Sequence, residues 1–240
     1  MRSSRPMQPF VRGMRDAIPI GTAYLAVAFS LGIAARNVGM NAPQGFLMSW
    51  LGMASAGEFA AITVIGADAP YWEMALITLV TNARYLLMSF ALSQHLDPGL
   101  PVWHRLLIGY SVTDELFGIS IAQETPLDPR YCYGAYTVAI PCWAIGTAIG
   151  VIAGNLLPAR VVSALSVLLF GMFIALIVPP AKKDKVVALF VVLAFGASFA
   201  ASRLPWVRDL SAGTRTTVLT VLLSAAAAAF FPKKEDDHAA

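Results

Sequence analysis

The sequence predicts an all-α protein, a polytopic membrane helical bundle of about eight transmembrane helices. Hydrophobic residues make up 58% of its 240 positions and charged residues only 13%, whereas soluble domains average ~45–50% apolar and ~25% charged. Charge-free runs cover residues 17–35, 37–57, 131–159 and 161–181. Since a helix needs about 20 apolar residues to cross a bilayer, these runs indicate membrane spans rather than buried helices of a soluble domain.

Turn-forming and charged residues divide the chain into the expected spans. Segments that cannot continue a helix, such as Gly66–Pro70 and Asp97–Gly99, separate neighbouring spans. Pro141 lies inside the long fifth span and predicts a kink or a break there. Seven spans stay an alternative, because the alanine-rich last span is weakly hydrophobic. The eight expected spans cover residues 17–36, 44–66, 72–94, 103–123, 131–155, 160–179, 186–202 and 214–231.

The charges around the spans predict the orientation of the chain. An even number of spans puts both termini on one side, and the N-terminal arginines indicate that this side is the cytoplasm of a bacterial inner membrane. We expect a cytoplasmic basic tail at 1–12, a single transmembrane transporter domain at 13–231 and a charged C-terminal tail at 232–240. Spans one to three and four to six could form two inverted three-helix units, a common plan among transporters.

Other functional classes find little support in the residues. The net charge is only +3 and no aromatic–basic groove accompanies it, which argues against nucleic-acid binding. Cys132 and Cys142 lie in or beside one apolar run, as packing residues do, and the three histidines lack the paired spacing of a metal site. No nucleophile, phosphate-loop or dinucleotide motif is present, so we expect no enzymatic activity, metal or cofactor.

Ionisable residues near the middle of three apolar stretches indicate transport. Glu58, Arg84 and the pair Asp114 and Glu115 would lie near the bilayer midplane, where a charge costs at least ~2.5–3.5 kcal/mol. We therefore expect Glu58, Arg84 and Asp114 to converge on one cavity that serves a solute or proton path. An ion or small-solute channel with a charged midplane filter is the alternative.

The types of these residues suggest separate roles. Arg84, two positions after Asn82, can receive a substrate carboxylate or can be locked structurally to a carboxyl group. Because desolvation favours the neutral form of a carboxyl group, Asp114, Glu115 or Glu58 could carry a proton. Structural pairing of Asp114 with Arg84 is again the alternative. Adjacent helical positions differ by about 100°, so Asp114 and Glu115 cannot both face one cavity.

Small residues inside two of the expected spans predict close helix packing or local unwinding. Gly146, Gly150 and Gly154 recur on one helix face and predict close packing against another helix. Ser55, Ala56 and Gly57 precede Glu58, and such small residues permit close packing or local unwinding that exposes backbone groups to a ligand.

The order of motifs resembles the AzlC family, the large subunit of branched-chain amino-acid exporters. The resemblance covers about residues 13–180, and Glu58 stands where the family pattern has a glutamine. This departure leaves the substrate or the coupling open. The matching elements are Pro19-Ile20-Gly21, Ala28-Phe29-Ser30-Leu31-Gly32, Ser49 followed by Ala54-Ser55-Ala56, Asn82-x-Arg84-Tyr85, Thr113-Asp114-Glu115 and Trp143-x-x-Gly146-Thr147-x-x-Gly150.

The resemblance implies efflux of leucine, isoleucine, valine or similar amino acids, with a small membrane partner of the AzlD type. Export against a gradient could be driven by proton antiport, with one midplane carboxyl group carrying the proton. A zwitterion also suits the residues, because its carboxylate needs Arg84 or helix N-termini and its ammonium group needs a carboxylate. The proton would be carried by Asp114, Glu115 or Glu58. The expected substrate-binding residues are Glu58, Asn82, Arg84, Thr113 and Asp114, with Phe29, Phe59 and Trp143 as the apolar wall.

Overall fold

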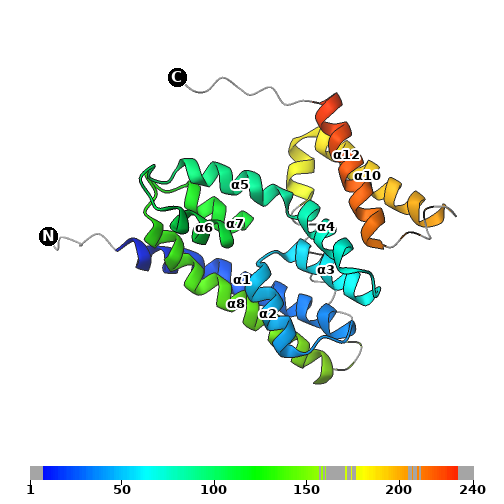
Figure 1. Cartoon of the computed structure of the whole chain (residues 1–240), viewed down its shortest axis with the longest axis horizontal. Coiled ribbons are helices and arrows are strands. Elements are labelled where there is room, and N and C mark those ends of the chain that lie inside the picture. Colours follow the sequence, from blue (N-terminus) through cyan, green and yellow to red (C-terminus); the bar gives the residue numbers. More distant parts are fainter. Residues whose placement is uncertain are drawn as a thin grey trace.

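Two long helices form the spine of the protein. A computed structural model describes residues 8–156, 177–204 and 212–231, with the single positions 158, 160, 171, 174, 207 and 210. Helix α1 (Pro9–Asn37) and helix α8 (Pro129–Leu156) lie side by side along the molecule (Figure 1). A Cβ atom on Gly32 would lie 2.1 Å from the carbonyl oxygen of Thr147, and one on Gly150 would lie 2.1 Å from that of Phe29. The close packing predicted from the glycine spacing is confirmed.

Helix α8 contains Pro141, where the sequence predicted a kink or a break. It continues through Pro141 without interruption, so the break that the proline suggested does not occur. Transmembrane helices tolerate proline because neighbouring helices, side chains and small local adjustments satisfy the backbone groups that it frees. The breaks in this protein lie elsewhere.

Three of the expected spans are each divided into two short helices. The second expected span consists of α2 (Ala42–Gly52) and α3 (Ser55–Gly66), and the third of α4 (Tyr71–Thr81) and α5 (Ala83–Gln94). The fourth consists of α6 (Val102–Tyr110) and α7 (Asp114–Ile121). In each pair, the ionisable residues singled out above lie in the first turn of the second half-helix. The protein thus contains broken helices, though at positions other than Pro141, and the first break lies beside the small residues that precede Glu58.

Local conformation explains how these helices stop and restart. Met53 adopts a left-handed conformation (φ 44°, ψ 36°) at the end of α2, and Ala54 is extended. At the third break, Thr113 is extended and its hydroxyl oxygen accepts the N–H of Leu116 at 3.3 Å, so it caps α7. The break at Asn82 is a single residue, and α4 and α5 are bent there by 48°.

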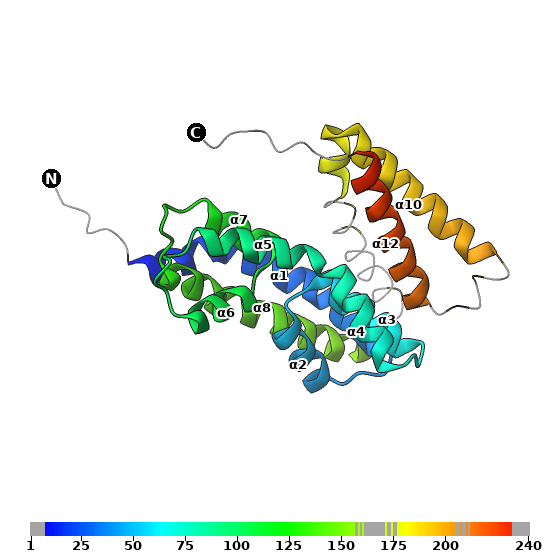
Figure 2. The ribbon, with the colours of Figure 1, turned by 45° about the horizontal axis from the view of Figure 1, so that its top comes forward.

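The C-terminal helices form a pair at one side of the spine. Helix α10 (Lys185–Arg203) and helix α12 (Ala212–Phe230) lie next to each other, and α12 contacts α4 and α3 (Figure 2). Glu73 in the first turn of α4 is only 4% exposed. Its Oε1 atom accepts the backbone N–H of Thr214 at 2.7 Å and the Thr214 hydroxyl at 3.0 Å. A carboxylate thus holds the N-terminus of α12, where the helix dipole favours negative charge.

The described residues contain fewer continuous spans than expected. The helices at Pro9–Asn37, Pro129–Gly154 and Lys185–Arg203 are long and apolar enough to cross a membrane, and α4 with α5 adds a fourth if the bent pair is one span. The number falls below eight partly because the second and fourth expected spans are pairs of short helices. The expected span 160–179 lies mostly outside the described residues, as do 1–7 and 232–240, while residues 9–12 are already helical.

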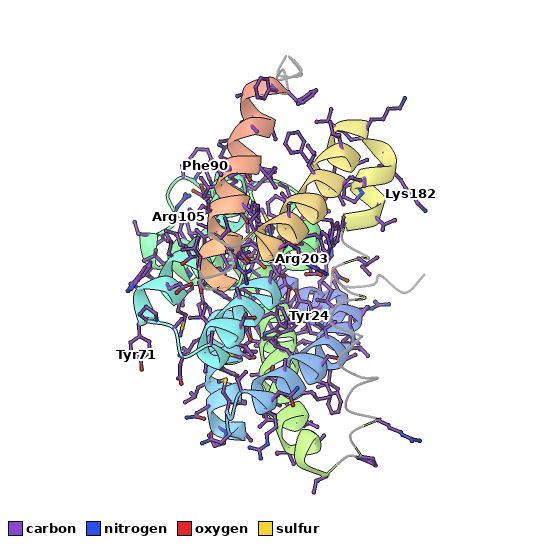
Figure 3. The ribbon with its side chains drawn as sticks, turned by 90° about the vertical axis from the view of Figure 1, so that its right-hand side faces the viewer. Tyr24, Tyr71, Phe90, Arg105, Lys182 and Arg203 are labelled. Atoms are coloured by element: carbon purple, nitrogen blue, oxygen red, sulfur yellow. The ribbon has the colours of Figure 1, made fainter. Side chains whose placement is uncertain are left out.

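The surface agrees with a membrane protein. Large apolar and aromatic side chains are exposed on most helices, and Tyr71 and Phe90 lie at the periphery of the molecule whereas Tyr24 lies in its interior (Figure 3). A soluble monomer rarely exposes such extensive apolar surface, but lipid accommodates it. The all-α membrane bundle predicted from composition is confirmed.

Candidate functional site

A pocket of about 160 Å³ lies where the three helix breaks meet the spine. The starts of α3, α5 and α7 each contribute residues to it, and α1 and α8 close the opposite side. Its wall combines apolar side chains with hydroxyl groups and two carboxylates. The lining residues are Ile20, Ala23, Tyr24, Val27, Met53, Ser55, Tyr85, Thr113, Asp114, Glu115 and Trp143.

Tyr24 connects α1 of the spine to the start of α7. Its hydroxyl group donates to Oε2 of Glu115 at 2.7 Å and is also hydrogen-bonded to the Thr113 hydroxyl. Since the single phenolic proton goes to Glu115, Thr113 donates to the tyrosine oxygen. The Tyr24 ring meets the indole of Trp143 edge to face, with 5.2 Å between ring centroids. One side chain therefore orders both the polar and the apolar part of the pocket.

An ion pair joins the starts of α5 and α7. Nη2 of Arg84 lies 2.9 Å from Oδ2 of Asp114, and the two side chains are 43% and 35% exposed. The guanidinium group also lies over the Tyr85 ring, 5.1 Å from its centroid. Asp114 lines the pocket and Arg84 lies directly behind it. This is the pairing that the sequence left open as the structural alternative to substrate binding.

Glu58 occupies a separate, buried network behind Trp143. Ser49 donates its hydroxyl to Oε2 of Glu58 at 2.5 Å, and the indole N–H of Trp143 donates to Oε1 at 2.8 Å. The backbone N–H of Ala54 donates to the same Oε1 at 3.1 Å, and the Ser49 hydroxyl also contacts that of Thr147 at 2.7 Å. Three donors thus hold the Glu58 carboxyl group, and the network ties the break between α2 and α3 to α8.

Asn82 marks the break between α4 and α5. Its amide group lies against Gly57 of α3, where a Cβ atom would come within 2.4 Å of the Asn82 nitrogen. Gly57 therefore provides the space that allows two of the three breaks to approach each other. Asn82 does not line the pocket; it sets the point at which α5, with Arg84 in its first turn, begins.

The structure brings together most, but not all, of the expected site residues. Thr113, Asp114, Glu115 and Trp143 line the pocket, and Arg84 and Glu58 each contact a lining residue. Phe29 instead borders a hollow on another face of α1, because it lies roughly 140° around the helix from Tyr24.

Of the expected apolar wall, Trp143 lines the pocket and the two phenylalanines do not. Phe59 packs against the hydrophobic core away from the pocket. Ile20, Val27 and Met53 take the place expected for the two phenylalanines.

Sequence reasoning did not single out the Tyr24 side chain. A phenolic hydroxyl in the middle of an apolar span needs a hydrogen-bond partner inside the protein, because lipid offers none. This rule could have placed Tyr24 at the site. Ser49, Tyr85 and Thr147 stood within the motifs quoted for the family resemblance, but no role had been expected for their side chains.

Comparisons with known proteins agree with the resemblance. The family described as AzlC protein matches residues 19–157. An uncharacterized membrane protein of Archaeoglobus fulgidus is 31% identical over 184 residues, which cover 76% of this chain and 80% of the relative. No solved structure matches the chain significantly.

Two relatives carry informative names. The inner membrane protein YgaZ of Escherichia coli is 25% identical over 61% of this chain and 61% of its own length. The branched-chain amino acid transport protein AzlC of Bacillus subtilis is 25% identical over 70% of this chain and 66% of its own length. The family match spans more than half of the chain and includes every residue that lines the pocket, so this membrane protein belongs to the AzlC family.

Proposed function

We propose that the chain is the large subunit of a secondary-active exporter that moves branched-chain or related hydrophobic amino acids out of the cell by proton antiport. The observation that carries this proposal is the Arg84–Asp114 ion pair beside a small, partly apolar pocket at the meeting point of three broken helices. Transporters commonly bind substrate where discontinuous helices meet near the bilayer midplane. The name of the Bacillus subtilis relative supports the substrate class.

The pocket suits a small aliphatic amino acid in size and polarity. Its volume of about 160 Å³ is close to that of an engineered apolar cavity, ~150 Å³, that accommodates benzene. Ile20, Val27 and Met53 would surround the side chain of the substrate. The same volume disfavours tryptophan and other large amino acids.

The charged ends of a zwitterion also find partners. The start of α3 has no side-chain cap, and Ser55 in its first turn lines the pocket. The free N–H groups of such a helix start attract a carboxylate. The ammonium group would lie near Glu115, whose Oε2 already accepts a hydrogen bond from Tyr24.

The ion pair offers a route to coupling. A substrate carboxylate that competes for Arg84 releases Asp114 from its only cationic contact among the described residues, and the freed Asp114 carboxylate can then accept the substrate ammonium group beside Glu115. A proton that binds Asp114 neutralises this carboxylate and removes the partner of the ammonium group. Proton and substrate would therefore exclude each other at Asp114, as antiport requires. In this scheme Arg84 pairs structurally in one state and binds substrate in another.

We further propose that the protein acts in a bacterial inner membrane with its N-terminus in the cytoplasm, together with a small AzlD-type subunit. The basic N-terminal residues support the orientation through the positive-inside rule, and family membership supports the partner.

The test is radiolabelled leucine flux in proteoliposomes, with and without an imposed pH gradient, for the wild-type protein and the Asp114→Asn variant. We expect the wild type to show saturable, gradient-driven efflux and counterflow, whereas a channel would show neither saturation nor counterflow. The variant should lose roughly tenfold or more of its gradient-driven flux but retain exchange at equal concentrations, since asparagine keeps the shape but cannot carry the proton. Unchanged gradient-driven flux would remove Asp114 from the proton path.

A further inference from the structure

A second, larger cavity lies between α10 and α12, outside the segment that matches the family and apart from the pocket described above. Its volume is about 590 Å³, within the range of ~300–1,000 Å³ that small-molecule sites occupy. At the end where α10 stops and α12 starts, it is lined by Arg215 with the hydroxyl-bearing residues Ser198 and Ser202.

Arg215 supplies the positive charge at this end of the cavity. Within the described part of the chain, no carboxylate lies within 4 Å of its guanidinium group. Glu73, which binds the N-terminus of α12, accepts hydrogen bonds from Thr214 instead. Arginine attracts anions at the end of an apolar helix pair, because its guanidinium group stays charged and all five of its N–H groups are donors. The cavity therefore favours a ligand that brings negative charge.

The other end of the groove is apolar. A hollow of about 940 Å³ shares Phe190, Ala194 and Ala227 with the first cavity and extends to Phe231. The carboxylate at this end, Asp184, accepts the N–H groups of Val186 and Val187 at 2.8 and 3.4 Å and so caps α10. The groove thus carries a cation at one end, the hydroxyl groups of Thr220 and Ser224 along α12, and mainly apolar side chains toward Phe231.

We propose that the groove between α10 and α12 binds an anionic phospholipid, with the headgroup phosphate at Arg215 and an acyl chain along Phe190. Helix α10 has 19 residues, which at 1.5 Å per residue span ~28 Å, close to the ~30 Å of a hydrocarbon core. Arg215, in the first turn of α12, therefore lies near the level of the headgroups. Basic pockets between membrane helices bind anionic headgroups in this way.

Native mass spectrometry of the purified full-length protein tests the proposal. Each variant is incubated with phosphatidylglycerol or with phosphatidylcholine, and the retained lipid is counted. We expect the wild type to prefer phosphatidylglycerol and the Arg215→Ala variant to retain it roughly fivefold less. Arg203→Ala is the matched control, because Arg203 stacks on Phe199 at 5.1 Å and does not line the cavity. Equal retention of both lipids by the wild type, or no loss in Arg215→Ala, would overturn the proposal.

A second pair of variants fills the groove without touching the arginine. Ala194→Trp should block the acyl channel and release lipid, whereas Ala200→Trp, on a position that does not line the cavity, should not. Displacement of phosphatidylglycerol by free glycerol phosphate at equal concentration would show that the site binds an anion rather than a lipid. A change in oligomeric mass in Ala194→Trp with unchanged lipid would assign the groove to a second copy of the chain. Either result contradicts the lipid proposal.

Discussion

The α1–α8 pair and the three broken helix pairs differ in how they satisfy the polypeptide backbone. In the spine, both helices run uninterrupted and their backbones meet at glycines. In the broken pairs, carbonyl groups at the helix ends lose their partners in the helix. Side chains replace some of them: Tyr136 of α8 donates its hydroxyl to the carbonyl oxygen of Ile108 at 2.7 Å, and Tyr110 donates to that of Trp50.

This difference separates the helices that support the pocket from the half-helices that carry its ionisable residues. Irregular backbone is tolerated at membrane depth only inside protein or beside a cavity, and the breaks lie against the spine around one pocket. The spine contributes Tyr24 and Trp143 as fixed walls, while the ionisable residues stand at the starts of α3, α5 and α7. We infer that the spine stays rigid and that the half-helices move during transport.

The largest effect is expected from a substitution in the spine. In Gly150→Val, the new Cβ would collide with the Phe29 carbonyl group, which backbone movement alone can relieve. Overpacking of this kind costs ~1–3 kcal/mol or more, so we expect little folded protein by size-exclusion chromatography and a lower thermal midpoint. Gly196→Val on α10 is the control, because no atom of another helix among the described residues lies within 4 Å of the position that its new Cβ would occupy. Equal stability of the two variants would contradict the idea of a rigid spine.

An effect of similar size concerns the network that anchors the first break. Glu58→Ala leaves the Trp143 indole N–H and the Ala54 N–H buried without an acceptor, at ~1–3 kcal/mol for each group. Glu58→Gln keeps that acceptor, and its amide can donate to Ser49, whose hydroxyl can then donate to Thr147. We therefore expect the glutamine variant to keep the thermal midpoint and the transport rate that the alanine variant loses. Loss of gradient-driven transport in a stable glutamine variant would instead place the proton on Glu58.

The spine and the location of the charges could be predicted from sequence because both depend on local patterns. The four-residue spacing of Gly146, Gly150 and Gly154 indicates a helix face for close packing, and Glu58, Arg84 and Asp114 interrupt apolar stretches. The helix breaks were harder to predict from the sequence, because contacts between residues far apart in the chain stabilise them. Met53 has no turn signature, yet Glu58, Ser49 and Trp143 stabilise the break beside it.

The packing of each helix, and the direction in which its faces point, explain the remaining differences between the predictions and the structure. Pro141 suggested a break, but packing against α1 keeps α8 continuous. Phe29 has the right chemistry for an apolar wall and lies on the wrong face of α1, while Tyr24 faces the pocket. Which face of an apolar helix points inward depends on its neighbours, and hydrophobicity alone gives little information where all faces are apolar.

A smaller effect on stability, but a clear one on transport, is expected at Arg84. Arg84→Ala and Arg84→Lys should each lower leucine efflux roughly tenfold or more, since lysine keeps the charge but loses the planar fork that grips a carboxylate. Stability should change little, because both partners of the ion pair are partly exposed. The double variant Arg84→Asp with Asp114→Arg separates the two roles. Restored efflux in this charge swap would show that the pair serves structure alone.

The smallest effect is expected at Tyr24, where the spine meets the moving half-helices. Tyr24→Phe keeps the ring that packs on Trp143 and removes the hydroxyl that contacts Glu115 and Thr113. Each of the two lost hydrogen bonds is worth ~0.5–1.5 kcal/mol, so leucine affinity in the flux assay should fall roughly twofold to tenfold or more, with a small drop in thermal midpoint. Tyr85→Phe is the comparison variant within the same pocket, since the Tyr85 hydroxyl makes only a long contact of 3.4 Å with Arg84 and does not join α1 to α7. If both tyrosine variants weaken transport equally, the contact between α1 and α7 has no special role. That result would contradict the division between a fixed spine and a moving α7, because this contact tests it most directly.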